Sequence, residues 1–212
     1  MKALLALSRG IDAVSERVGR TLYWLVLATV LISAANATVR KLFNYSSNSY
    51  LEIQWYLFSL IFLLGAGYTL KHNEHVRIDI VSGRLSARGR AVIDILGTLL
   101  FLLPMALLIM WLSWPVFVDS YVRNEVSTNA GGLIIWPARL MVPVGFFLLV
   151  VQAVSELIKR VAFLQGIIPD PGERIVVKTA EEELAEEILR ARGERALAEE
   201  IEGLAKGRTE QP

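Results

Sequence analysis

The sequence predicts an all-α membrane protein with four transmembrane helices, an N-terminal amphipathic segment and a helical C-terminal tail in the cytosol. Of its 212 residues, 54% are hydrophobic, whereas soluble domains usually have about 45–50% by a similar count. The excess gathers in four blocks, and each supplies the roughly 20 apolar residues that a helix needs to cross a bilayer. The helices of a soluble bundle would have polar faces, which stretches such as LFSLIFLLGAGYTL lack.

Charge divides the chain into a basic body and an acidic tail. Residues 1–169 carry 15 Lys and Arg against 9 Asp and Glu, whereas residues 170–212 carry 7 against 12. Cysteine is absent, which excludes disulfides, thiolate metal sites and cysteine nucleophiles. The sequence has no phosphate-binding loop, nucleophile elbow or zinc-protease motif. We therefore expect no enzymatic activity, no cofactor, no bound metal and no nucleic-acid partner.

The first element is the segment of residues 1–20, which contains four basic residues. Its apolar residues recur at helical spacing: Leu4, Leu7, Ile11, Val14 and Val18. This pattern is typical of a cytoplasmic helix that lies on the membrane surface with its basic residues toward lipid phosphates. A cleaved signal peptide is the alternative, because Ala35-Asn36-Ala37 has the form of a cleavage site. A leading charged region of about 20 residues is long for a signal peptide, however.

The transmembrane domain is predicted over residues 21–160. Its apolar blocks are residues 21–39, 50–70, 91–118 and 133–158. The acids Glu52 and Asp94 lie near block ends, where we expect solvated or ion-paired groups at the membrane interface. A proton or ion relay would instead place acids within the spans.

Prolines and glycines inside these blocks predict how the helices pack. Pro104 interrupts the third block and Pro143 the fourth, so we expect kinks or local packing adjustments there. Gly65 and Gly67 in the second block predict a close approach by a neighbouring helix, because small residues let helix backbones come together in membranes.

The loop of residues 71–90, KHNEHVRIDIVSGRLSARGR, is predicted to be a cytoplasmic turn between the second and third helices. It holds five of the eleven Lys and Arg residues that flank one side of the four blocks, and the opposite side has four. Basic flanks stay in the cytoplasm, so both termini and this loop are predicted to be cytoplasmic. Its basic residues would hold the hairpin at anionic lipid headgroups.

A metal site is a second reading of the same loop. His72 and His75 are the two histidines of the chain, and their spacing would let them share a helical face with Glu74 or Asp79 as a further ligand. Such sites usually need three or four protein ligands, and haem needs axial ligands that face one another. We therefore interpret both histidines as ordinary interfacial residues.

The tail of residues 161–212 changes character at Pro169-Asp170-Pro171-Gly172. Residues 180–205 are rich in Ala, Glu and Leu, with apolar residues at helical spacing and a weak point at Gly193. This predicts a cytosolic amphipathic helix. Its narrow apolar stripe favours a solvated helix over one that packs on a partner.

Three stretches of the chain resemble the small membrane subunit of a tripartite ATP-independent periplasmic (TRAP) transporter. They are NYSSNSYLEIQWYLFSLIFLLGAGYTL at 44–70, NEHVRIDIVSGRLSARGRAVIDILG at 73–97 and TNAGGLIIWPARLMVPVGFFLLVVQAVSELIKR at 128–160. The resemblance covers about residues 15–165. Glu52 and the HVRID segment, residues 75–79, are its most telling features.

The resemblance implies a non-catalytic small permease subunit in a bacterial inner membrane. A large membrane subunit would hold the substrate and sodium sites, and a periplasmic solute-binding protein would deliver an organic acid. The small subunit would scaffold the large one among the membrane lipids, and residues 44–80 are similar to the branch linked to 2-oxo acids. Structural or membrane-anchoring roles would fall to Glu52, His75, Arg77, Asp79 and Arg84.

Two other functions fit an all-helical membrane protein. The chain could be the membrane anchor of a redox enzyme that binds haem or quinone, in which case His72 and His75 would matter. It could also be an independent small channel or transporter. The few polar groups in the middle of the blocks argue against both.

Overall fold

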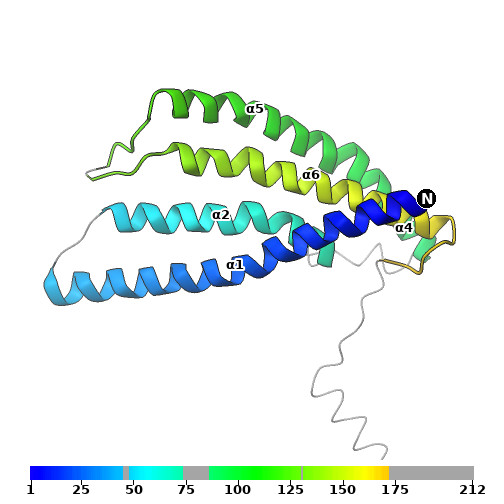
Figure 1. Ribbon diagram of the computed structural model, residues 1–212, viewed down its shortest axis with the longest axis horizontal. Coiled ribbons are helices and arrows are strands. Elements are labelled where there is room, and N and C mark those ends of the chain that lie inside the picture. The colour runs from blue at the N-terminus through cyan, green and yellow to red at the C-terminus, as the bar shows by residue number, and fades with distance from the viewer. Residues whose placement is uncertain (45–47, 74–85, 130, 172–212) are drawn as a thin grey trace, which may run out of the picture. The chain divides into compact units, whose positions relative to one another are not determined.

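The computed structural model describes residues 1–44, 48–73, 86–129 and 131–171. Its helices are α1 (Lys2–Phe43), α2 (Asn48–His72), α4 (Ala87–Gly97), the π-helical turn η1 (Thr98–Leu102), α5 (Leu103–Val122) and α6 (Trp136–Leu164) (Figure 1). α4, η1 and α5 follow without a break and form one helix of 36 residues. Four helices are therefore long and apolar enough to cross a membrane, which confirms the predicted all-α membrane protein with four transmembrane helices. The predicted tail helix over residues 180–205 lies outside the described residues.

α1 extends through the predicted boundary at residue 20. It is 42 residues long, or about 63 Å at the rise of an α-helix, which is twice the roughly 30 Å hydrocarbon thickness of a bilayer. Residues 1–20 are helical, as predicted, and continue directly into the first apolar block. The change from polar to apolar side chains near Arg20 does not end the helix, because its backbone hydrogen bonds do not depend on that polarity.

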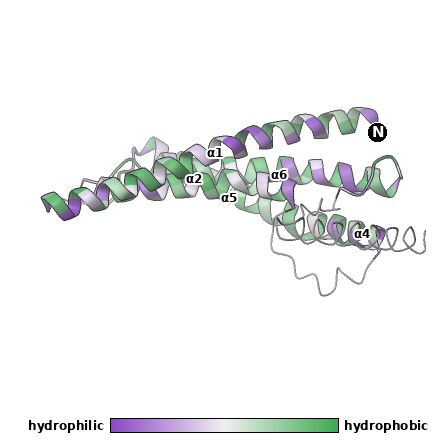
Figure 2. Ribbon diagram, turned by 90° about the horizontal axis from the view of Figure 1, so that it is seen from below, coloured by the Kyte–Doolittle hydropathy of each residue, from purple (hydrophilic) through white to green (hydrophobic). Residues whose placement is uncertain are grey.

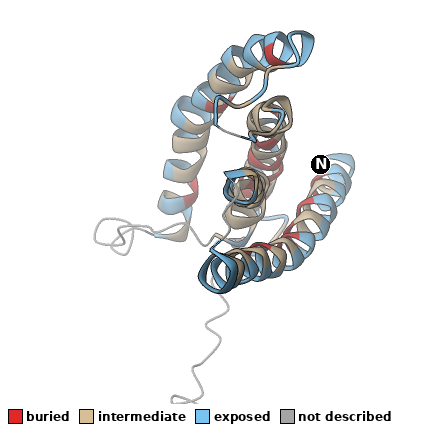
Figure 3. Ribbon diagram, turned by 90° about the vertical axis from the view of Figure 1, so that its left-hand side faces the viewer, coloured by how far each residue is buried: buried red, intermediate tan, exposed pale blue. Residues whose placement is uncertain are grey.

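α6 is the helix against which the others pack. It contacts α1, α2, α4 and α5, and Figure 1 shows it between α2 and α5. Figure 3 places the buried residues mainly on the sides of the helices that face inward. The buried residues of α6 are mostly small or polar, namely Pro143, Gly145, Gln152, Ala153, Ser155, Arg160 and Ala162. Small residues let neighbouring helices come close to its backbone.

Glycines mark the close approaches between helices. A Cβ added at Gly145 would stand 2.8 Å from the carbonyl oxygen of Leu63 on α2, so only glycine fits there. A Cβ added at Gly67 would stand 3.5 Å from the carbonyl oxygen of Leu148 on α6. A Cβ added at Gly65 would stand 3.3 Å from the side chain of Leu22 on α1. The predicted close approach at Gly65 and Gly67 is therefore confirmed, with a different neighbouring helix at each.

Pro104 is accommodated by the π-helical turn that precedes it. The ring of proline clashes with the carbonyl four residues earlier and leaves that carbonyl without its donor. In the η1 turn the N–H of Leu103 donates to the carbonyl of Thr98, five residues earlier, which is the wider hydrogen-bond spacing of a π-helix. The packing adjustment predicted at Pro104 thus takes the form of a widened turn.

Large apolar side chains cover much of the outside of the helices. Phe62 on α2 is 79% exposed, Phe101 on η1 74% and Trp111 on α5 78%. Figure 2 shows hydrophilic residues gathering along the first half of α1 and at the neighbouring ends of α4 and α6. Exposed apolar side chains in such number mark a surface that contacts lipid or another apolar protein surface.

Candidate functional site: polar clusters at the two ends of the helices

The structure describes one of the residues predicted for the site and leaves the others outside its described ranges. Glu52 lies on α2 and is described below. His75, Arg77, Asp79 and Arg84 lie outside the residues that the structure describes. Among the described residues, polar side chains gather in two places, and only the second contains a residue that the sequence singled out, Glu52. One is where α1, α2 and α6 meet, and the other is where the loop between α5 and α6 meets α2.

The first half of α1 is fastened to α6 by buried serines. Ser8 and Ser155 share a hydrogen bond of 2.7 Å between their hydroxyl oxygens. One heptad later, Ser15 donates to Oε1 of Gln152 at 2.7 Å. All four side chains are buried. The buried face of α1 is therefore its small polar face, whereas Leu4, Leu7 and Val14, from the predicted apolar stripe, are exposed.

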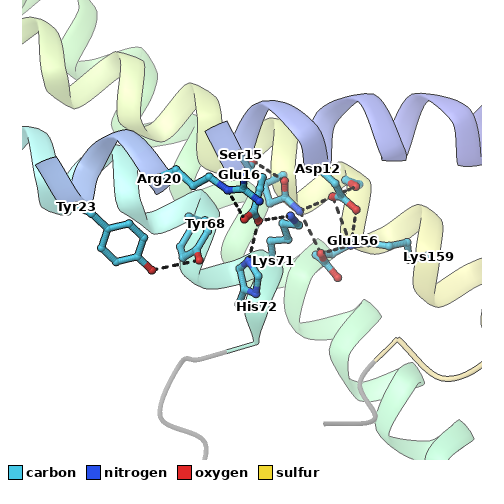
Figure 4. Close-up of polar contacts among 12 residues, drawn as sticks. Asp12, Ser15, Glu16, Arg20, Tyr23, Tyr68, Lys71, His72, Glu156 and Lys159 are labelled. Carbon is cyan, nitrogen blue, oxygen red and sulfur yellow. Dashed lines mark hydrogen bonds and ion pairs between the residues drawn. The ribbon is translucent and has the colours of Figure 1, made fainter. Parts of the chain in front are cut away.

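Asp12 is the centre of this contact between α1 and α6. Its carboxylate accepts hydrogen bonds of 2.9 Å from both Nε2 of Gln152 and the hydroxyl of Ser155. Nζ of Lys159 lies 3.1 Å from its other oxygen and also pairs with Glu156 on the same helix. Figure 4 shows these side chains converging from the two helices. We call the set Ser8, Asp12, Ser15, Gln152, Ser155, Glu156 and Lys159 the α1–α6 cluster.

One turn further along α1, Glu16 joins the helix to the end of α2. Its carboxylate lies 2.6 Å from Nζ of Lys71 and 3.1 Å from Nε2 of His72. Arg20 pairs with it from the next turn of α1. The ring of His72 also packs on Tyr68, with 4.4 Å between ring centroids. His72 thus has structural partners on two helices (Figure 4), while His75 and Glu74, the other residues of the proposed metal site, lie beyond the described part of the chain.

Asp94 forms the ion pair expected of an acid near a block end. Its carboxylate on α4 lies 2.9 Å from the guanidinium of Arg160 on α6. The side chain of Arg160 is only 8% exposed and that of Asp94 is 22% exposed. The pair joins the start of the third transmembrane helix to the end of the fourth. Because both side chains are largely buried, removing either one would leave the other as a buried charge without its partner, which is costly.

At the other end of the helices, Glu52 holds the loop between α5 and α6. Its carboxylate accepts hydrogen bonds from the hydroxyl of Ser127, from Nδ2 of Asn129 at 2.8 Å and from the backbone N–H of Leu133 at 2.7 Å. Ser49, one turn earlier on α2, donates to the carbonyl of Gly131. We call Ser49, Glu52 and these loop residues the Glu52 cluster.

The same loop has a defined fold of its own. Val126 and Ile134 face each other in an antiparallel bridge, and the backbone N–H of Ser127 donates to the carbonyl of Leu133 at 2.9 Å. The guanidinium of Arg139 makes two hydrogen bonds to the carboxylate of Glu125 across the base of the loop. This bidentate geometry is among the stronger charged contacts in proteins.

Both clusters consist of contacts within the chain. The carboxylates of Asp12, Glu16 and Glu52 each accept hydrogen bonds from two or more donors on another helix or loop. Groups satisfied in this way hold helices and loops in register, because a buried polar group without a partner is costly. The sequence signal that could have found the α1–α6 cluster is the heptad spacing of Ser8 and Ser15, which places both on one face of α1.

Comparison with known proteins gives one match. A family model described as tripartite ATP-independent periplasmic transporters, DctQ component, matches residues 29–163. The matched part includes α2 to most of α6 and therefore the whole Glu52 cluster, whereas Asp12 and Glu16 precede it. Neither the curated proteins nor the solved structures give a match to the chain.

Proposed function

Because the chain belongs to the DctQ family of tripartite ATP-independent periplasmic transporter components, we propose that it scaffolds the large transport subunit without catalysing a step itself. The observation that supports this most is the division of its surface. Many charged side chains of the described residues pair with one another toward the two ends of the helices, while large apolar side chains remain exposed between them. Such a surface suits a partner membrane protein and lipid.

The proposed complex carries out sodium-coupled uptake of an organic acid in a bacterial inner membrane. A periplasmic solute-binding protein delivers the solute, and the large subunit holds the substrate and sodium sites. A 2-oxo acid is the proposed solute class, supported by the likeness of residues 44–80 to that branch of the family. Sodium-dependent uptake into vesicles that contain all three components, with 2-oxo acids and other organic acids compared, tests this.

The proposed topology places both termini in the cytoplasm. Residues 21–160 form the transmembrane domain, and residues 1–20 and 161–212 lie in the cytoplasm. The support is the excess of Lys and Arg in the three flanks on that side. On this topology the Glu52 cluster faces the periplasm, and His75, Arg77, Asp79 and Arg84 hold the cytoplasmic hairpin at the headgroups. Labelling of single cysteines placed at residue 2 and at residue 128 in intact cells tests this, since only the periplasmic one should react.

Affinity purification of the tagged full-length chain in mild detergent tests the scaffold role. A large polytopic membrane protein recovered in near-equal amount, and absent from an untagged control, is the expected result. A soluble dehydrogenase as the main partner would instead identify a redox anchor. A chain that is recovered alone as an oligomer would indicate an independent channel. Either of these two results overturns the proposal.

A further inference from the structure

An elongated groove runs between α2 and the helix formed by α4, η1 and α5. Its volume is about 570 Å³. α6 forms its floor through Phe146, Leu149, Glu156 and Arg160. Phe146 and Arg160 are 14 positions apart, so the floor is about 21 Å long at the rise of an α-helix. The groove exists because α2 and α5 both pack on α6 and have few contacts with each other.

The groove is apolar along most of its length and polar at one end. Leu102, Met105, Ala106 and Phe146 line the part nearer the middle of the helices. Asn73, Asp94, Glu156 and Arg160 line the end nearer the start of α4. This order, apolar toward the centre and polar toward one end, matches the order of polarity in half of a lipid bilayer.

The polar end carries charges of both signs, and Arg90 beside it is an exposed cation. Asp94 and Arg160 neutralise each other, and Glu156 pairs with Lys159. Arg90 lies one turn before Asp94 on α4, and its side chain is 46% exposed. It pairs at 3.9 Å with Asp170, which also lies 3.9 Å from Arg160. Arg90, Asp94, Gly97 and Phe101 share one face of the helix by their spacing, so Arg90 stands just beyond the polar end of the groove.

We propose that this groove binds one acyl chain of an anionic phospholipid, with the lipid phosphate at Arg90. The size of the groove favours an acyl chain over a helix of a partner protein. A helix with its side chains is about 10–12 Å wide, which is wider than a groove of this volume spread over about 21 Å. The exposed cation at the polar end complements a phosphate, and the apolar walls complement the chain.

Gly97 provides a variant whose added side chain begins in open space within the groove. It lines the groove, and a Cβ added there meets no atom of the chain within 4 Å. Gly97→Leu therefore places a side chain in the space proposed for lipid. Gly10→Leu is the matched control, because Gly10 on α1 is equally open and lies outside the groove. Both substitutions favour the helix, since glycine is among the poorest helix formers.

Native mass spectrometry of the delipidated full-length chain, titrated with dioleoyl phosphatidylglycerol, measures the binding. We expect the unmodified chain and Gly10→Leu to bind one phospholipid. We expect Gly97→Leu to bind it about tenfold more weakly, since losing the burial of about two methylenes has this effect. Equal lipid binding by the two glycine variants, with unchanged melting temperatures, would overturn the site.

Arg90→Gln tests the headgroup. Arg40→Gln is its matched control, because Arg40 is also an exposed arginine but lies in the last turn of α1, at the other end of the helices. We expect the unmodified chain and Arg40→Gln to prefer phosphatidylglycerol over phosphatidylcholine, and Arg90→Gln to lose that preference. An unmodified chain without this preference would overturn the proposal that the lipid at Arg90 is anionic. If position 105 crosslinks to a copurified protein and no lipid is bound, the occupant of the groove is a protein, and the proposal of a lipid is overturned.

Discussion

Asp12 on α1 and Lys159 on α6 form an ion pair of 3.1 Å across 147 positions of sequence. Both side chains are about one-fifth exposed. The pair is the charged centre of the α1–α6 cluster, in which Gln152 and Ser155 also donate to Asp12. Because Asp12 precedes the part of the chain that matches the family model, it fastens a segment outside that match to a helix within it.

We expect the Asp12–Lys159 pair to contribute about 1 kcal/mol of coupling energy to the stability of the chain. A double-mutant cycle of Asp12→Ala, Lys159→Ala and the double variant, unfolded in mixed micelles, measures it. Asp12→Ala should be the more destabilising single substitution, since it removes the acceptor of three donors. A coupling energy indistinguishable from zero would show that the buried serines hold the two helices together without the ion pair.

Gly145 and Gly10 should respond in opposite ways to the same substitution. Gly145→Ala places a Cβ 2.8 Å from the backbone oxygen of Leu63, and overpacking of this kind costs about 1–3 kcal/mol. Gly10→Ala meets no neighbour within 4 Å and should stabilise the helix by up to about 1 kcal/mol. Thermal unfolding in detergent measures both. A melting temperature for Gly145→Ala equal to or above that of the unmodified chain would contradict the close contact of α2 and α6.

Hydrophobic blocks were enough to predict the four helices, because length and apolarity alone determine which segments can span a bilayer. The blocks did not reveal that residues 1–20 and the first span form one helix, since a change of polarity leaves the helix backbone intact. Pro104 predicted a local adjustment, but its form as a π-helical turn depends on how the carbonyl of Thr98 is satisfied. That cannot be read from a pattern of side chains.

The polar clusters were less predictable than the helices. Periodicity shows that Ser8 and Ser15 share a face of α1, but it does not show which helix that face meets. Glu52 was expected at the membrane interface, and its partners lie in a loop that starts about 75 positions later. Such pairings depend on how the helices assemble, and a single sequence carries no direct signal of that.

Glu52→Ala should loosen the loop between α5 and α6 and leave the helices folded. The substitution removes the acceptor of the N–H of Leu133 and of the side chains of Ser127 and Asn129. We expect faster amide hydrogen exchange over residues 127–133, as local opening becomes easier. Hydrogen–deuterium exchange with mass spectrometry measures this.

Asp119→Ala is the control for Glu52→Ala. Asp119 pairs with Arg123 within α5 at the same end of the helices, and both side chains are more than half exposed. Exposed pairs of this spacing contribute little, so loop exchange should stay at the level of the unmodified chain. If the two substitutions accelerate exchange equally, the loop is held by its own backbone contacts and not by Glu52.

Arg77→Ala and Asp79→Ala test the proposed anchoring role of the hairpin. Both residues lie beyond the part of the chain that the structure describes, and the proposal rests on their place between two spans in a strongly basic segment. We expect each variant to lower the amount of large subunit recovered with the tagged chain, because a hairpin less firmly held at the headgroups positions α2 and α4 less well. Arg40→Ala, at the other end of the helices, should leave recovery unchanged. Normal recovery and normal solute uptake in both hairpin variants would remove these two residues from the proposed role. The contacts of Glu16 with Lys71 and His72 would then account for how the end of α2 is held.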